Sequence, residues 1–83
     1  DMPTCELTDD DFREGTIDIL DILHKSGLAG SRSEARRNVE QGGVSVDGNA
    51  VNDVKAVFAK ESLEGEGVVV KRGKKKFVKV IAK

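Results

Sequence analysis

The hydrophobic period of the chain changes at Gly42-Gly43, and this change constrains the fold more than any other feature. Before these glycines, apolar residues recur at the three-to-four-residue spacing of helices. After them, Val44 and Val46 alternate with Ser45, as in a strand with one buried face. Helices followed by strands are typical of an α+β domain. We therefore expect a two-helix hairpin packed on one face of a small, mostly antiparallel β-sheet.

The first half of the chain predicts two helices, over residues 16–26 and 31–41. Thr16 can cap the first helix, and the lone histidine, His24, lies near its end, where a surface or capping role is far commoner than a ligand role. Ser31 opens the second helix with the spacing of a capping box. Because the connection between the helices is only four residues, we expect a tight helical hairpin or a helix-turn-helix-like corner.

The second half predicts short strands separated by turn signals, with residues 55–66 left ambiguous between strand, helical turn and loop. Apolar residues alternate with polar ones on either side of a strong Asp-Gly turn signal. A second hairpin is expected over residues 67–82. The expected elements are strand Val44–Val46, turn Asp47-Gly48, a return strand within 50–54, strand Val68–Lys71, a turn around Gly73 and strand Phe77–Ile81.

Residues 1–15 are acidic and precede these elements. A short strand is expected near Thr4–Leu7, followed by a loop or helical turn through Asp9–Arg13. We interpret this segment as an acidic lead-in and tether, and residues 16–83 as the domain. The chain starts with Asp1 rather than an initiator methionine, so we expect it to be a piece of a longer protein.

Charge is distributed unevenly, although the net charge of the 83 residues is only −1. The first 21 residues carry −7 and the remainder +6. Crowded bases often mark a site for an anionic polymer, the alternative being a solvated turn and helix face. Ser31 and the free N–H groups at its helix start add an anion-attracting site. The bases form two groups, Arg32, Arg36 and Arg37 in the second helix and Lys71, Arg72, Lys74, Lys75 and Lys76 around the second hairpin.

The residue inventory assigns no catalytic residue, metal ligand or cofactor to this chain. With a single cysteine, Cys5, no internal disulfide can form, and with a single histidine as well we expect no Cys–His or Ser–His–Asp catalytic arrangement. The run Asp9–Asp11 is interpreted as a solvated acidic loop rather than a metal site, and Gly65–Gly67 lacks the remainder of a phosphate-binding loop. The longest apolar run, Val68–Val70, is too short to span a membrane.

Three motifs together form a specific signature: Ser31-Arg32-x-x-Ala35-Arg36, the turn Gln41-Gly42-Gly43, and Val44-x-Val46-x-Gly48. On these residues the chain resembles the S-four-like (alpha-L) RNA-binding domain. The basic run within 70–77, which ends at an aromatic residue, narrows the resemblance to the C-terminal domain of bacterial tyrosyl-tRNA synthetases.

This resemblance implies a non-catalytic domain that holds tyrosine tRNA, near its long variable arm and anticodon stem, through phosphate contacts. It also implies a cytoplasmic, homodimeric parent enzyme, a tyrosine–tRNA ligase that uses ATP and tyrosine. The fragment itself is expected to be a monomer with no cofactor and no membrane contact. The alternatives are an S-four-like rRNA-binding domain of a ribosome-associated factor or RNA-modifying enzyme, and a small protein-interaction domain.

The expected RNA contacts are Ser31 and the eight bases of the two groups. For this interpretation to hold, the fold must bring both groups onto one surface. The acidic N-terminal stretch should lie away from them, because phosphates repel it. The three phenylalanines are expected in the core, since Phe is more often buried than stacked on a base.

Overall fold

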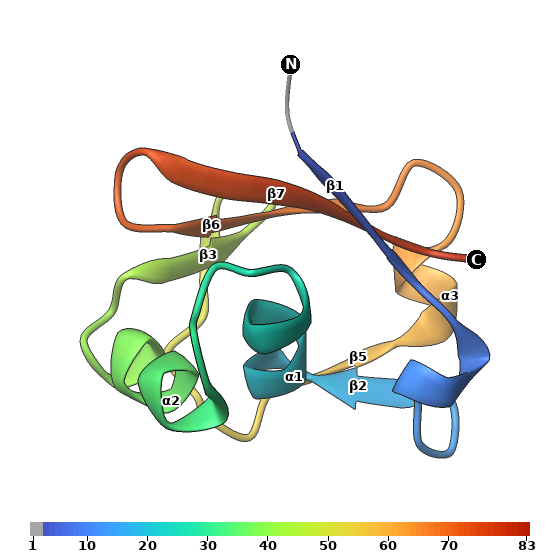
Figure 1. Ribbon diagram of the computed structural model, residues 1–83, viewed down its shortest axis with the longest axis horizontal. Helices are drawn as coiled ribbons and strands as arrows, with labels where there is room; N and C mark the ends of the chain where they lie inside the picture. Colours follow the sequence, from blue (N-terminus) through green and yellow to red (C-terminus); the bar gives the residue numbers. More distant parts are fainter. Residues whose placement is uncertain (1–2) are drawn as a thin grey trace.

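The computed structural model describes residues 3–83, which form a sheet with helices and a small two-stranded ribbon beneath it (Figure 1). Residues 1 and 2 of the expected lead-in lie outside the described part. In chain order the elements are β1 (Thr4–Leu7), the 3₁₀-helix η1 (Asp9–Asp11), β2 (Thr16–Asp18), α1 (Ile19–Lys25), α2 (Arg32–Glu40), β3 (Val44–Val46), β4 (Asn49–Ala50), β5 (Val57–Ala59), α3 (Lys60–Leu63), β6 (Val68–Arg72) and β7 (Lys76–Ala82).

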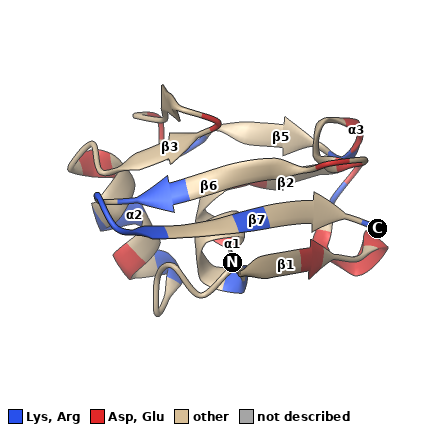
Figure 2. Ribbon diagram, turned by 90° about the horizontal axis from the view of Figure 1, so that it is seen from above, with Lys and Arg blue, Asp and Glu red and all other residues tan. Residues whose placement is uncertain are grey.

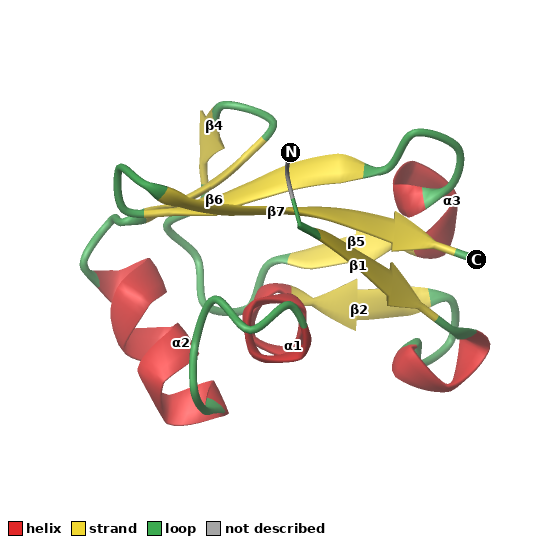
Figure 3. Cartoon of the chain, turned by 45° about the horizontal axis from the view of Figure 1, so that its top comes forward, coloured by secondary structure: helices red, strands yellow, loops and turns green. Residues whose placement is uncertain are grey.

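A five-stranded sheet in the order β1-β7-β6-β3-β4 forms the upper layer of Figure 1. β1 runs parallel to β7, and the other three pairings are antiparallel. The hairpin of α1 and α2 lies under one face of this sheet, and the two-stranded ribbon of β2 and β5 lies beside α1 (Figures 1 and 3). The expected α+β architecture, a helical hairpin on a mostly antiparallel sheet, is confirmed.

One hydrophobic core lies between the helices and the sheet. Helix side chains such as Leu23 and Val39 meet strand side chains such as Val70 and Val80, and all four are at most 1% exposed. Burying each such side chain contributes about 1.5–3 kcal/mol. The chain therefore has a core of its own, which consists of Leu7, Ile17, Ile19, Ile22, Leu23, Leu28, Ala29, Ala35, Val39, Val44, Val46, Leu63, Val70, Val78, Val80 and Ala82.

The first helix begins three residues later than expected, so the prediction that Thr16 caps it is wrong. Residues Thr16–Asp18 instead form β2, which pairs antiparallel with β5 and places Ile17 opposite Phe58. Asp18 is the actual N-cap, since its side chain accepts a 2.7 Å hydrogen bond from the backbone N–H of Asp21. Pairing with a strand about 40 residues further along the chain overrides the local helical pattern.

The second helix and both hairpins lie where the sequence predicts them. Ser31 caps α2 by accepting a 3.1 Å hydrogen bond from the N–H of Glu34. The Glu34 carboxylate reaches back one residue further than in a capping box, to the N–H of Gly30 at 2.6 Å. The return strand after Asp47-Gly48 is β4, which begins one residue before the expected range, so that only Ala50 of residues 50–54 pairs with β3.

The short strand expected at Thr4–Leu7 is confirmed as β1, an edge strand of the main sheet. Leu7 is 1% exposed and pairs with Ala82, and its carbonyl accepts a 2.9 Å hydrogen bond from Lys83. The acidic lead-in therefore contributes a strand and a core side chain to the same sheet.

The three phenylalanines are not equivalent. Phe12 and Phe58 pack against the core as expected. Phe77 is 39% exposed, so the expectation of a buried side chain is wrong at that position. The burial pattern of β7 gives the reason, because Val78, Val80 and Ala82 occupy the core face and leave Phe77 on the opposite one.

Candidate nucleic-acid interface

The fold brings the two basic groups to the same end of the molecule. The turn between β6 and β7 lies against the Gly42-Gly43 turn that ends α2, and the backbone N–H of Gly73 donates a 2.7 Å hydrogen bond to the carbonyl of Gly43. Strand pairing reinforces this contact, because Val44 lies opposite Arg72 in the sheet. Figure 2 shows the basic hairpin tip and α2 at the same end of the molecule.

The lysines of this end are presented to solvent. Lys71, Lys74, Lys75 and Lys76 are all exposed, and none has a carboxylate within 4.0 Å among residues 3–83. Repulsion between such neighbours costs some tenths of a kcal/mol for each close pair, which an anionic ligand would relieve.

The arginines of α2 differ from one another. Arg36 is exposed and makes only a loose pair with Glu40, with 3.6 Å between Nε and Oε2. Arg37 is exposed and has no ion pair within the described part of the chain. Both side chains can bind a ligand with little loss of existing contacts.

A shallow groove of about 400 Å³ lies between the turn after α2 and the hairpin tip. Glycines form much of its wall, so a ligand backbone can approach the protein backbone closely. Lys71 and Lys74 place positive charge beside it. The groove is lined by Gly42, Gly43, Val44, Ser45, Gly48, Ala50, Lys71, Gly73 and Lys74.

Arg72 is held partly within the fold, unlike the lysines around it. Its side chain is half-buried, and its Nε atom has no hydrogen-bond partner among the described residues. Asn38 on α2 has a buried Nδ2 atom in the same condition. Alternation along β6 directs Arg72 to the core face of the sheet while Lys71 points outward. Of the expected contact residues in this hairpin, Arg72 is therefore the least accessible.

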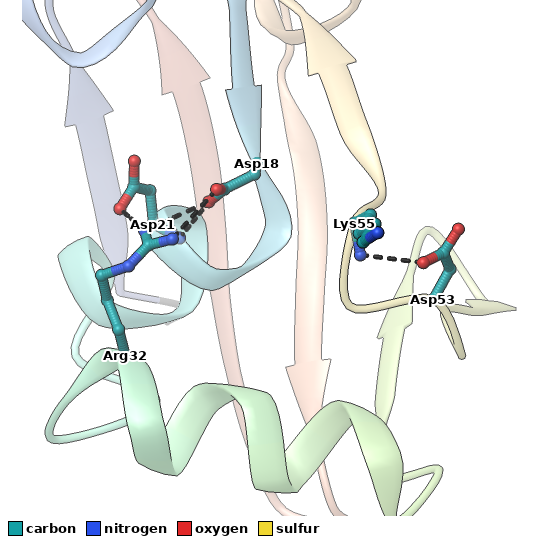
Figure 4. A network of polar contacts seen from close by, with 5 residues as sticks. All are labelled: Asp18, Asp21, Arg32, Asp53 and Lys55. Atoms are coloured by element: carbon teal, nitrogen blue, oxygen red, sulfur yellow. Dashed lines mark hydrogen bonds and ion pairs between the residues drawn. The ribbon is translucent and has the colours of Figure 1, made fainter.

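Arg32 is occupied by an internal ion pair, which the sequence analysis missed. Its guanidinium binds the carboxylates of Asp18 and Asp21, with 3.1 Å between Nη2 and the Asp18 Oδ2 atom (Figure 4). The hydrogen bond to Asp18 raises the pKa of Arg32 above its ordinary value. Arg32 thus ties the start of α2 to the start of α1. No local signal reveals this pair, because 14 and 11 residues separate the partners.

The acidic run Asp9–Asp11 lies at the far end of the molecule from the hairpin tip, as expected (Figure 2). Asp9 pairs with Lys60, and Asp11 with Lys25 at 2.7 Å. Only part of the acidic stretch is segregated in this way, because Asp18 and Asp21 contact Arg32. Acidic and basic charge are therefore not wholly separated beyond the N-terminal stretch, because Asp18 and Asp21 lie beside a base of α2.

Asp18 is expected to make the fold sensitive to acid. Burial raises the pKa of Asp18, but hydrogen bonds from Arg32 and from the Asp21 N–H outweigh it and the net pKa is lowered. A lowered pKa contributes stability that is present above the unfolded value of about 3.9 and is lost as pH falls below it. We expect Asp18→Asn, which keeps an oxygen for the cap, to lose about 1 kcal/mol at pH 7 and less at pH 3.

Urea unfolding at the two pH values measures this difference. Asp10→Asn is the matched control, because Asp10 is exposed and has no ion pair within residues 3–83. A loss for Asp18→Asn that is the same at pH 3 and pH 7 would contradict the role of its charge.

The helical hairpin on a five-stranded sheet is an α+β fold of the kind expected for the S-four-like class of domain. No helix in the described part of the chain has the length and apolar character needed to cross a membrane. The model of one family, the tyrosine–tRNA ligase SYY-like C-terminal domain, matches residues 1–80. The chain belongs to this family, and the resemblance inferred from its motifs is confirmed.

Curated relatives agree with the family model. The chain is 40% identical over 81 residues to the tyrosine–tRNA ligase of Treponema denticola, covering 96% of this chain and 20% of that protein. It is 35% identical over 80 residues to that of Clostridium botulinum (96% and 19%) and 43% identical over 77 residues to that of Lachnoclostridium phytofermentans (92% and 18%). The chain spans about a fifth of the length of these relatives, and it matches a C-terminal, non-catalytic part of an aminoacyl-tRNA synthetase.

Proposed function

We propose that this chain binds tyrosine tRNA through phosphate contacts at its basic end, near the long variable arm and the anticodon stem. The observation that carries the proposal is the contact between the hairpin tip and the turn after α2. That contact, from the Gly73 N–H to the Gly43 carbonyl, brings the lysine-bearing tip against the end of the helix that carries Arg36 and Arg37, and so supports a shared binding site for two groups far apart in the chain. The relatives are named tyrosine–tRNA ligases, and from this name we infer that the RNA bound is tyrosine tRNA.

Phosphate recognition suits the residues of this surface. Arginine binds phosphate through its planar fork, and lysine binds it as a mobile point charge. Structured RNA is held mostly by its shape and by phosphate and 2′-hydroxyl contacts, so affinity and position come from these bases rather than base reading. With about five phosphates neutralised, log K should fall with log salt at a slope of roughly −3.5 to −4.5.

The proposed contact residues contribute unequally. The exposed bases Arg36, Arg37 and the four hairpin lysines can bind without breaking a strong internal contact. Arg32 must exchange two carboxylates for a phosphate, and Arg72 must leave the core face of the sheet. Ser31 already uses its oxygen to cap α2. We expect these three to contribute least.

The parent protein is proposed to be a cytoplasmic, homodimeric tyrosine–tRNA ligase that uses ATP and tyrosine outside this domain. The domain itself is proposed to act as a monomer without cofactor, metal or membrane contact. Its role is to hold the body of the tRNA while the acceptor end reaches the catalytic part.

A titration tests the proposal. Tyrosine tRNA and a tRNA with a short variable arm are titrated into the chain at two salt concentrations, with anisotropy of the labelled RNA as the readout. We expect tighter binding of tyrosine tRNA and a steep salt dependence for both. Equal affinities would remove the long-arm preference. No binding of either RNA at low salt would contradict the whole proposal and leave the protein-interaction alternative.

A further inference from the structure

The sheet has one face that no helix covers. Both long helices lie under the opposite face (Figure 1). The strand register shows which residues lie on this open face near the hairpin tip. One row crosses four strands through Ala50, Ser45, Lys71 and Phe77, which are neighbours in that order. The next row towards the chain termini contains Val69, Lys79 and Thr4.

Phe77 is the large apolar side chain that this open face exposes to solvent. It is 39% exposed, and in the described part of the chain only one other large apolar residue, Val57, is exposed to a comparable extent. Its two nearest long neighbours are cationic, with Lys71 directly across on β6 and Lys79 two residues along β7. An aromatic ring between two lysines on an open sheet offers a flat apolar surface with anion-attracting flanks.

The basic groove is continuous with this ring. Ser45, Ala50 and Lys71 line the groove and lie in the same row as Phe77. A strand of RNA whose phosphates pass through the groove is therefore led, past Lys71, to the ring. Two carboxylates lie on or beside this face. Glu6, opposite Ile81, pairs with Lys83 at 3.5 Å, and Asp47, next to Val69, accepts a 2.8 Å hydrogen bond from the Val69 N–H.

We propose that Phe77 stacks on an unpaired base of the bound RNA, with Lys71 and Lys79 holding the flanking phosphates. This inference rests on the proposed function, and it adds a binding residue outside the two basic groups. Stacking tolerates any base, because every base has a flat π-face. The occupant is RNA rather than a protein surface because the ring is bordered by cations and connected to a groove that favours a polyanion.

Tryptophan fluorescence tests the stacking directly. The chain contains no Trp and no Tyr, so Phe77→Trp introduces its only strong fluorophore. We expect tyrosine tRNA to quench this fluorescence, with a midpoint that matches the affinity measured by anisotropy. Val57→Trp is the matched control, because Val57 is 59% exposed and lies on β5 in the other, two-stranded sheet. Its fluorescence should change little.

Affinity gives a second readout that separates stacking from charge. Phe77→Ala should weaken tRNA binding about fivefold or more while leaving the salt slope unchanged, and Phe77→Leu should weaken it to a similar extent because leucine keeps apolar area but has no ring. Circular dichroism melts confirm that each variant is folded.

The outcomes distinguish this inference from the proposed function. If the unmodified chain does not bind tyrosine tRNA, both the proposed function and the stacking inference are wrong. Normal binding combined with an unquenched Phe77→Trp, with equal quenching of both tryptophan variants, or with full affinity in Phe77→Ala would overturn the stacking inference alone. Full affinity in Phe77→Ala would leave the open face to a protein partner.

Discussion

Changing Lys74, Lys75 and Lys76 together to Ala should weaken binding of tyrosine tRNA at least tenfold at about 0.1 M salt. All three side chains are exposed at the hairpin tip and have no carboxylate partner within the described residues. Each phosphate contact that is lost should reduce the slope of log K against log salt by about 0.7–0.9. We therefore expect a slope reduced by about 2, measured by anisotropy at several salt concentrations.

The control variant removes the same charge from elsewhere. Lysines that pair with acids away from the tip leave the basic end intact, so their loss should leave the slope nearly unchanged. Both variants must keep the thermal melt of the parent chain to within a few degrees. An equal effect of both would mean that net charge, rather than the hairpin tip, governs binding. The control lysines are Lys25, Lys60 and Lys83, which pair with Asp11, Asp9 and Glu6.

Gly67→Ala should destabilise the fold by about 2–5 kcal/mol, the largest loss expected from a single methyl group in this chain. Gly67 enters β6 with φ +73°, a backbone conformation that costs other residues about 1–2 kcal/mol. A Cβ atom there would also lie 2.4 Å from the carbonyl oxygen of Val80 and 2.6 Å from Cγ1 of Ile81. Because the obstructing oxygen belongs to the backbone of β7, relief requires movement of a central strand.

Gly65→Ala separates the two causes of this loss. Gly65 has nearly the same φ, +75°, but a Cβ atom there meets nothing within 4 Å. We expect a loss of about 1–2 kcal/mol, which reflects the backbone conformation alone. Urea unfolding followed by far-UV circular dichroism measures both variants. Similar losses at the two glycines would show that β7 yields easily, and the steric argument at Gly67 would fail.

The parts of the fold that follow from local patterns were predictable from the sequence. The Ser31 cap and the alternation of Val44 with Val46 are each decided within a few residues. The confirmed family resemblance depends on the same short motifs. The grouping of the bases was also visible, because five of them fall within residues 71–76.

The predictions from sequence were wrong where a contact with a residue distant in the chain outweighs the local pattern. Thr16 has the properties of a helix cap, but β5 pairs with its segment and turns it into a strand. Arg32 lies four residues before Arg36, on the same helix face, and was expected to bind RNA. Its guanidinium instead forms ion pairs with Asp18 and Asp21. In each case the deciding contact spans more than ten residues.

The amino-acid order alone therefore determined the class of fold, the positions of the main helices and strands, and the clustering of charge, because each depends on interactions between near neighbours. Tertiary structure decided which bases are free to meet a ligand and which face of the sheet Phe77 occupies. The physical reason is that an ion pair, a groove or an open sheet face exists only when segments far apart in the chain are packed together, and a one-dimensional pattern carries no distance between them.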